Sequence, residues 1–414
     1  MTKKNKCLLT FILSEEYLLK LYRFFFCTFS RKIVLHMPIP PNIISSCVRI
    51  SLITELGGFF HVLARRFIQM PGQNSHKASF LDIMVKRHKF DYSSSQSKMV
   101  NLGVNTRSVG SLKIHGQMPL LVTGAFNDAK LWHIGPNLEL SCVAAFEGDN
   151  TSNLTAVAIH PKKPIMATVA VGNYPTVNLY QILDRYTPKH LTSLTCFATN
   201  DVSSITFSEN GEMVSFSTID GTVNVFQILL EPLKVKHVLT IHLDVCVFGI
   251  VFHPILPIIA IYSRSGTMQL WKLKTRTSPA SCVAKWEAHR DGWIISCVFS
   301  HLGDIILTGS SDETIKVWHM QQKQDGGIDV FFVATLNGHG GAVNSVAFHP
   351  SLPSIFVSAS MDCTARVWRL LPDFSSATCI LKLVGDDNMS CAGFLPDGCG
   401  LITGSSNSEM RLWK

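Results

Sequence analysis

The sequence lacks the common signatures of catalytic and metal-binding chains. Its 414 residues contain no G-x-S-x-G, H-E-x-x-H or G-x-x-x-x-G-K-[S/T] motif, so the usual hydrolase, metalloprotease and nucleotide-binding patterns are absent. None of its 12 cysteines stands in a C-x-x-C pair, which removes the usual zinc and thioredoxin-like patterns. We therefore expect a protein that is not an enzyme, with no catalytic residue, no bound metal and no cofactor.

Charge is also scarce, and it is unevenly distributed. Charged residues make up 16% of the chain and hydrophobic residues 46%, which excludes a wholly disordered protein. The net charge of +8 arises in residues 1–95, where 14 Lys and Arg oppose 5 Asp and Glu; residues 96–414 hold 23 and 24. The second region gives no electrostatic reason to bind phosphates, so we expect no direct contact with nucleic acid.

What the sequence does contain is a long internal repeat. An aromatic residue closes a short alternating phrase seven times, with gaps of 48, 46, 45, 47, 50 and 45 residues. A fixed period of this length indicates one supersecondary unit repeated along the chain. The seven aromatic residues are Trp132, Tyr180, Phe226, Trp271, Trp318, Trp368 and Trp413.

Each unit predicts four short antiparallel strands. A first run such as Val343–Phe348 alternates apolar with small or polar residues, as a half-buried strand does. A turn follows, often His-Pro as at His160, His253 and His349, and proline or glycine there favours chain reversal. An apolar strand, a tight polar turn, the strand that ends in the aromatic residue and a more variable fourth strand complete the unit. The pattern predicts an all-β chain of seven four-stranded units.

These phrases resemble the WD-repeat family of β-propellers, from near Lys98 to Lys414. The resemblance implies a seven-bladed propeller in which a His, a Ser or Thr, an Asp and the Trp of one unit form a hydrogen-bonded tetrad. Such a network satisfies buried polar groups, so we interpret it as structural rather than catalytic. The matching residues of the two best units are His289, Thr308, Asp312 and Trp318, and His339, Ser358, Asp362 and Trp368.

Other units depart from the tetrad pattern. The fourth unit keeps His242 but has Ser265 where the Asp is expected. The last unit has Asn407 for the Asp and Asp386 for the His, and the third retains Asp220 without a His. The first two units have neither residue clearly. We interpret Asp386 as a solvated loop charge.

The two ends of the repeat region complement each other. The last unit ends on its third strand, and the segment 98–102 precedes the first strand of the first unit. Pairing this segment with the last unit would complete its sheet and remove an exposed edge. We therefore expect a closing strand at 98–102.

The N-terminal residues 1–95 share neither the period nor the composition of residues 96–414, so we treat them as a separate, partly helical extension and linker. The aromatic and basic stretch 17–29 suggests one alternative, a helix that contacts a membrane surface. Residues 40–67 suggest another, because they faintly resemble an F-box, the module that docks an adaptor in ubiquitin ligases. That resemblance implies a substrate receptor as the alternative function.

Because no common catalytic motif is present, we expect the protein to act through its surface. The resemblance implies a non-enzymatic scaffold for protein or peptide partners, bound on the propeller face that carries the loops between strands four and one and between strands two and three. A propeller enzyme, with ligands drawn from several blades, is a further alternative. The scattered cysteines favour an intracellular protein, cytoplasmic or nuclear. Residues of the kinds that concentrate binding energy on this face are Trp293, Arg264, Phe248, Met361, Arg290 and Asn344, with Ile219 as a filling residue.

Overall fold

The computed structural model describes residues 97–100, 108–125, 128–136, 139–147, 156–170, 176–195, 202–230, 233–273, 279–323 and 327–413. All of them belong to the second of the two units into which the chain divides, Met1–Leu81 and Asp82–Lys414. The stretch 17–29 and the F-box-like segment 40–67 lie outside the described residues, so those two hypotheses stay predictions.

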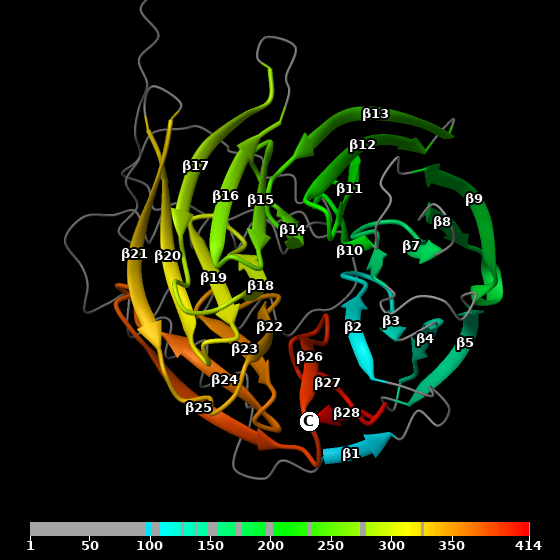
Figure 1. Cartoon of the computed structure of the whole chain (residues 1–414). Coiled ribbons are helices and arrows are strands. Elements are labelled where there is room, and N and C mark those ends of the chain that lie inside the picture. Colours follow the sequence, from blue (N-terminus) through cyan, green and yellow to red (C-terminus); the bar gives the residue numbers. More distant parts are fainter. Residues whose placement is uncertain are drawn as a thin grey trace, which may run out of the picture. The chain divides into compact units, whose positions relative to one another are not determined.

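The described residues form seven four-stranded antiparallel sheets. Six of these blades use four consecutive strands, and blade 7 combines the last three strands with the first (Figure 1). The elements are blade 1, β2 (Val109–Ile114), β3 (Leu120–Ala125), β4 (Asp128–Ile134) and β5 (Leu140–Glu147); blade 2, β6 (Val157–Ile159), β7 (Ile165–Ala170), β8 (Thr176–Ile182), the 3-10 turn η1 (Asp184–Tyr186) and β9 (Pro188–Thr195); blade 3, β10 (Val202–Phe207), β11 (Met213–Thr218), β12 (Thr222–Leu230) and β13 (Leu233–His242); blade 4, β14 (Val247–Phe252), β15 (Ile258–Ser263), β16 (Thr267–Lys272) and β17 (Ser281–Glu287); blade 5, β18 (Ile294–Phe299), β19 (Ile305–Ser310), β20 (Ile315–Gln322) and β21 (Ile328–Leu336); blade 6, β22 (Val343–Phe348), β23 (Ile355–Ser360), β24 (Thr364–Leu370) and β25 (Ala377–Val384); and blade 7, β26 (Met389–Phe394), β27 (Leu401–Ser405), β28 (Met410–Trp413) and β1 (Ser97–Val100).

The blades stand around a ring. The first strand of each blade contacts the first strand of the next, from β2 through β26 and back to β2. The second strands are the most deeply buried; every residue of β19 and β23 is inaccessible to solvent. The prediction of an all-β, seven-bladed propeller is confirmed.

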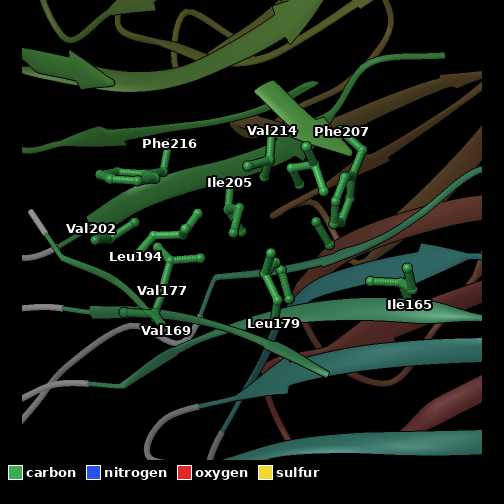
Figure 2. Close-up of a cluster of buried hydrophobic side chains, with 13 residues drawn as sticks. Ile165, Val169, Val177, Leu179, Leu194, Val202, Ile205, Phe207, Val214 and Phe216 are labelled. Carbon is green, nitrogen blue, oxygen red and sulfur yellow. The ribbon is translucent and has the colours of Figure 1, made fainter. Parts of the chain in front are cut away.

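The hydrophobic core lies between blades rather than within one. Seven clusters of buried side chains in the described residues each draw on two neighbouring blades. Figure 2 shows the cluster shared by blades 2 and 3, where Leu179 and Leu194 face Ile205 and Phe216. Because one blade cannot bury both faces of its sheet alone, the ring is held together by the burial of apolar area at each interface.

The two ends of the ring meet in blade 7. Strand β1 pairs antiparallel with β28, with Ser97 opposite Trp413 and Val100 opposite Met410. The predicted closing strand is therefore present, beginning one residue earlier than expected. No helix among the described residues is long and apolar enough to cross a membrane.

Candidate functional site

The two complete tetrads lie in blades 5 and 6. In blade 6, Trp368 donates from Nε1 to Ser358 Oγ at 2.8 Å, and that oxygen lies 2.7 Å from His339 Nε2. The other ring nitrogen of His339 lies 2.8 Å from Asp362 Oδ2. The simplest proton arrangement is a neutral imidazole that donates from Nδ1 to the carboxylate and accepts from the serine hydroxyl at Nε2.

Blade 5 repeats this geometry with threonine in place of serine. The distances are 3.1 Å from Trp318 Nε1 to Thr308 Oγ1, 2.8 Å from that oxygen to His289 Nε2, and 2.7 Å from His289 Nδ1 to Asp312 Oδ2. Each network joins the loop before the first strand to the second and third strands and the turn between them. The structure thus brings together the eight residues that the resemblance singled out.

The carboxylates of both tetrads are held in the charged form. Partial burial alone would raise the pKa of Asp362, but hydrogen bonds from Thr364 and His339 lower it to about 2. Burial also raises the pKa of Asp312, but hydrogen bonds from His289 and Thr314 lower it by more, so the net change is a decrease. Burial lowers the pKa of His339 despite its hydrogen bond to Asp362. These directions fit a stable structural network of a carboxylate and a neutral imidazole.

The remaining tryptophan anchors keep only part of the network. In blades 1 and 7, Trp132 and Trp413 each donate to a threonine of the second strand at 2.9 Å, Thr123 and Thr403. In blade 4, Trp271 instead donates to Gln269 of its own strand at 2.9 Å. The tryptophan N–H is thus satisfied in each of these blades without the histidine.

The residues expected at the histidine site in blades 4 and 7 have different outcomes. His242 is exposed at the end of β13, opposite Thr222, and is two positions short of the site that His289 occupies after β17. Counting from the strand register places Asp244 at that site, so the assignment of His242 to blade 4 was wrong. Asp386, by contrast, lies at the equivalent site, two residues beyond Val384 of β25, and its 70% exposed carboxylate pairs with Arg411 rather than being only solvated.

Blades 2 and 3 contain a different polar network. Their anchors, Tyr180 and Phe226, have no indole N–H. In blade 3, Thr240 donates to Asn224 Oδ1 at 2.8 Å, and its hydroxyl lies 2.8 Å from His237 Nε2. The His237 ring stands edge-on to Phe226, with centroids 5.1 Å apart.

Blade 2 repeats this arrangement. Ser193 donates to Asn178 Oδ1 at 2.6 Å, and its hydroxyl lies 3.0 Å from His190 Nε2. The His190 ring is edge-on to Tyr180 at 5.5 Å. These polar groups connect the third strand to the outer strand instead of connecting the loop to the second strand.

The predicted partner face is formed by loops that are fixed to their own blades. The amide N–H of Ser311 donates to the Trp293 carbonyl at 3.0 Å, and the Trp293 N–H donates to Ser311 Oγ at 2.8 Å. A Cβ at Gly292 would lie 2.6 Å from Ser310 Oγ, so glycine is required for this close approach. The equivalent backbone bond in blade 4 joins Arg264 to Cys246 at 2.9 Å.

Three of the predicted face residues form one cluster across the boundary of blades 4 and 5. The Arg264 guanidinium lies 4.0 Å above the Trp293 ring, and the Phe248 ring is stacked near the same indole with centroids 6.2 Å apart. Trp293 is 43% exposed, whereas Phe248 is half-buried against the core shared by blades 4 and 5. The geometry is that of a cation–π pair whose indole still faces solvent.

The other predicted face residues do not join this cluster. Arg290 is 80% exposed and its Nε lies 3.4 Å from Glu287. Met361 is 51% exposed and its N–H is bonded to the Ala342 carbonyl, while Ile219 is also exposed. Asn344 donates to the Met389 carbonyl at 3.0 Å and so joins blade 6 to blade 7.

A set of interblade contacts was not anticipated from the sequence. The turn histidines His115, His160 and His349 each accept backbone N–H groups of their own turn at Nδ1. Their Nε2 atoms lie 3.1–3.2 Å from carbonyls of the next blade, those of Lys163, Gly211 and Gly398. We call these histidines the latch histidines, together with His253, whose Nδ1 accepts the N–H groups of its turn in the same way but whose Nε2 has no hydrogen-bond partner among the described residues.

Three of the latch histidine rings lie against a glycine with positive φ in the turn of the next blade. A Cβ at Gly211, Gly303 or Gly398 would lie 2.0–2.4 Å from the ring of His160, His253 or His349. Burial lowers the pKa of His253 to about 4, and it lowers the pKa of His115 and His160 as well. The neutral ring that these geometries need is therefore favoured. The spacing of about 50 residues between His-Pro and turn glycine was the available sequence signal.

The described residues contain neither a candidate metal site nor a disulfide. Among them, no group of three or more His, Cys, Asp and Glu side chains could hold a metal ion. The cysteines that the structure describes are free thiols, with Cys297 and Cys391 buried.

Comparison with known proteins agrees with this geometry. The family described as "WD domain, G-beta repeat" matches residues 280–319, 331–369 and 377–414. These segments begin on or near the outer strand of one blade and end near the aromatic anchor of the next, so the sequence repeat is offset from the blade by one strand.

Several curated proteins are similar over part of the chain. Nuclear distribution protein PAC1 of Komagataella phaffii is 31% identical over 40% of this chain and 33% of its own length. Pre-mRNA-processing factor 19 homolog 2 of Arabidopsis thaliana is 35% identical, covering 29% and 22%, and GID complex subunit 7 of Schizosaccharomyces pombe is 34% identical, covering 25% and 18%. The similarity thus spans a third or less of these relatives. The chain is therefore a seven-bladed β-propeller that contains WD repeats, matched in residues 280–319, 331–369 and 377–414.

Proposed function

We propose that this protein is a non-enzymatic scaffold that binds protein partners on the loop face of its propeller, with the Arg264–Trp293 pair at the centre of the contact. The observation that carries the proposal is the exposed indole of Trp293, with the Arg264 guanidinium over its ring and the Phe248 ring stacked nearby. Tryptophan and arginine dominate binding energy at protein interfaces. A rigid aromatic residue also loses little conformational entropy on binding.

The relatives support the class of function without naming the partner. One is named as a subunit of a GID complex and another as a nuclear distribution protein. A scaffold in which loops vary over a constant ring is consistent with such roles. Free thiols in the described strands support the proposal of an intracellular, reducing location.

The test is a comparison of captured partners. The full chain carrying Trp293→Ala and Arg264→Ala is expected to lose its principal partner in affinity purification followed by mass spectrometry. Its thermal midpoint should stay within about 2 °C of the unmodified protein, because both side chains are surface residues. Phe332→Ala, which removes an exposed aromatic residue from the outer strand of blade 5, serves as the control and should keep the partner. Retention of the same partners by the double variant would refute the proposal.

A further inference from the structure

The outer strands of blades 2 and 3 differ from those of the other blades at one register position. In six blades the outer strand has a bulge beside the aromatic anchor, which makes the residues opposite the anchor equivalent from blade to blade. Blade 2 places Lys189 and His190 there, and blade 3 places Lys236 and His237. The other four blades carry uncharged pairs, Ser141–Cys142, Ser281–Cys282, Phe331–Phe332 and Thr378–Cys379.

The fold does not require these Lys-His pairs. The same position accepts serine, threonine, cysteine or phenylalanine in the other blades, so a structural reason common to all blades is excluded. Edge lysines also discourage sheets from joining edge to edge. A lysine at any exposed position of the strand would serve that purpose, and it would not need the same register in two adjacent blades.

The surface around the pairs is basic and exposed. Lys189, His190, Lys234, Lys236 and His237 are all exposed. Neither β9 nor β13 contains an acidic residue. Within the described part of the chain, none of the three lysines takes part in an ion pair. The two strands border one core cluster, because Leu191 and Leu194 of β9 and Val235 of β13 pack into it. Figure 2 labels Leu194 in that cluster.

The histidines of this surface are held in place. The bond from His237 to Thr240, and from there to Asn224, fixes one imidazole against its anchor, and the equivalent bonds fix His190. Both strands are outermost in their sheets, so each has one edge that pairs with no described strand. A free edge offers backbone N–H and C=O groups to an extended peptide.

From these equivalent pairs and the free edges of their strands we infer a second interaction surface, the basic rim of blades 2 and 3, formed by β9 and β13, which binds an extended acidic segment of a partner protein. The segment would add to the free edge of β13 and place its carboxylates opposite Lys234 and Lys236. Opposite charges directly across a strand pair are stabilising. This surface is separate from the loop-face cluster, and the inference does not depend on that cluster binding a partner.

The probe is a fluorescein-labelled peptide of alternating Glu and Val, with a Lys-Val peptide of equal length as the control ligand. The full chain is titrated in fluorescence anisotropy at 50 and 200 mM NaCl. Binding of the acidic peptide, weakened at least threefold by the higher salt, is expected, since exposed charge pairs are screened. Absence of binding at 100 μM protein, or equal binding of the basic peptide, would overturn the inference.

Two double variants that lower the net charge equally locate the binding surface. Lys189→Ser with Lys236→Thr gives blades 2 and 3 residues that other blades carry, and it lowers the net charge by two. Ser281→Glu with Thr378→Glu lowers it equally at the same register position of blades 4 and 6. The first double variant should raise the Kd at least tenfold and the second less than twofold. Equal losses would show only an effect of total charge and would refute the surface.

Vesicles containing 30% phosphatidylserine test the other anionic partner. Lysine-dependent sedimentation with them, in the absence of peptide binding, would replace the inference with a membrane-binding rim. Size-exclusion chromatography of the Lys189→Ser, Lys236→Thr protein addresses edge protection. If the peptide Kd is unchanged while the variant self-associates, the lysines serve only to prevent edge-to-edge association of sheets, and the inference is refuted.

Discussion

Two pairs of blades form the same four-stranded sheet with different internal hydrogen-bond networks. One pair is blades 5 and 6, and the other is blades 2 and 3. In blades 5 and 6, the indole N–H, a hydroxyl, an imidazole and a carboxylate form one chain from the third strand to the loop. In blades 2 and 3 the anchor is Tyr180 or Phe226, and the polar chain runs outward to the edge strand. In both pairs of blades, the polar side chains of these networks are hydrogen-bonded to one another.

The difference shows what the propeller itself requires. It requires an aromatic side chain at the anchor and apolar clusters between blades, and both regions have these. The tetrad adds stability to a blade that already has this packing. In blades 2 and 3, where the tetrad is absent, the outer strand carries histidines and lysines beside the anchor, and the rim becomes the distinctive surface of the blade.

The sharpest test of this comparison changes one histidine in each region. His339→Ala in blade 6 removes the imidazole between Asp362 and Ser358 and leaves a half-buried carboxylate without that donor. We expect it to lower the free energy of unfolding by about 3 kcal/mol. His237→Ala in blade 3, the matched control, removes an exposed ring and should cost no more than about 0.5 kcal/mol. Urea unfolding at pH 7.5 measures both, and equal losses would contradict the distinction.

We expect acid to destabilise both regions together, because latch histidines lie in blades of both. The pKa of His253 is lowered from its ordinary value of 6.5 to about 4, so the unfolded chain binds the proton that the folded chain resists. Stability is then full above about pH 6.5 and falls as the pH decreases toward 4. We expect the thermal midpoint to decrease by roughly 5 °C from pH 7.5 to pH 4.5.

His253→Asn isolates the latch in that experiment. The Asn side-chain oxygen can accept the turn N–H groups that His253 Nδ1 accepts, at 2.9–3.0 Å, without titrating. The variant should therefore show a visibly smaller decrease over the same pH range. Asp362, with a pKa of about 2, loses its contribution only below about pH 4 and does not interfere. An unchanged pH profile would remove the latch from the explanation of acid sensitivity.

The repeat and its closure could be predicted from sequence because they depend on local patterns. Alternation, turn residues and the spacing of seven aromatic anchors are all contained within single units. The tetrads were accessible for the same reason, since a Gly-His before the first strand and a Ser-x-Asp turn mark them in blade 6. His242 was misassigned because the loop after β13 offered no Gly-His, and only the register with Thr222 shows that it lies two positions early.

The remaining contacts either join residues of different blades or depend on an irregularity within one strand, and no local pattern specifies these. The Arg264–Trp293 pair crosses from blade 4 to blade 5, and the His160 latch reaches Gly211 in the next blade. The outward network of Asn224, Thr240 and His237 depends on a bulge in the outer strand. Such a bulge shifts which residues face each other by one position, and the sequence alone gives no sign of where it occurs.

The smallest expected effect tests whether the outward network is a true substitute for the tetrad. Asn224→Ala leaves the Thr240 hydroxyl without its buried acceptor at 2.8 Å, and we expect a loss of about 1 kcal/mol in urea unfolding. Thr240 can turn toward water at the sheet edge, which is why the loss should be smaller than that of His339→Ala. Asn178→Ala in blade 2 should behave alike, because its bond to Ser193 is equivalent. If either variant costs as much as His339→Ala, the outward network carries the same structural weight as a tetrad, and the two regions differ only in where their polar groups point.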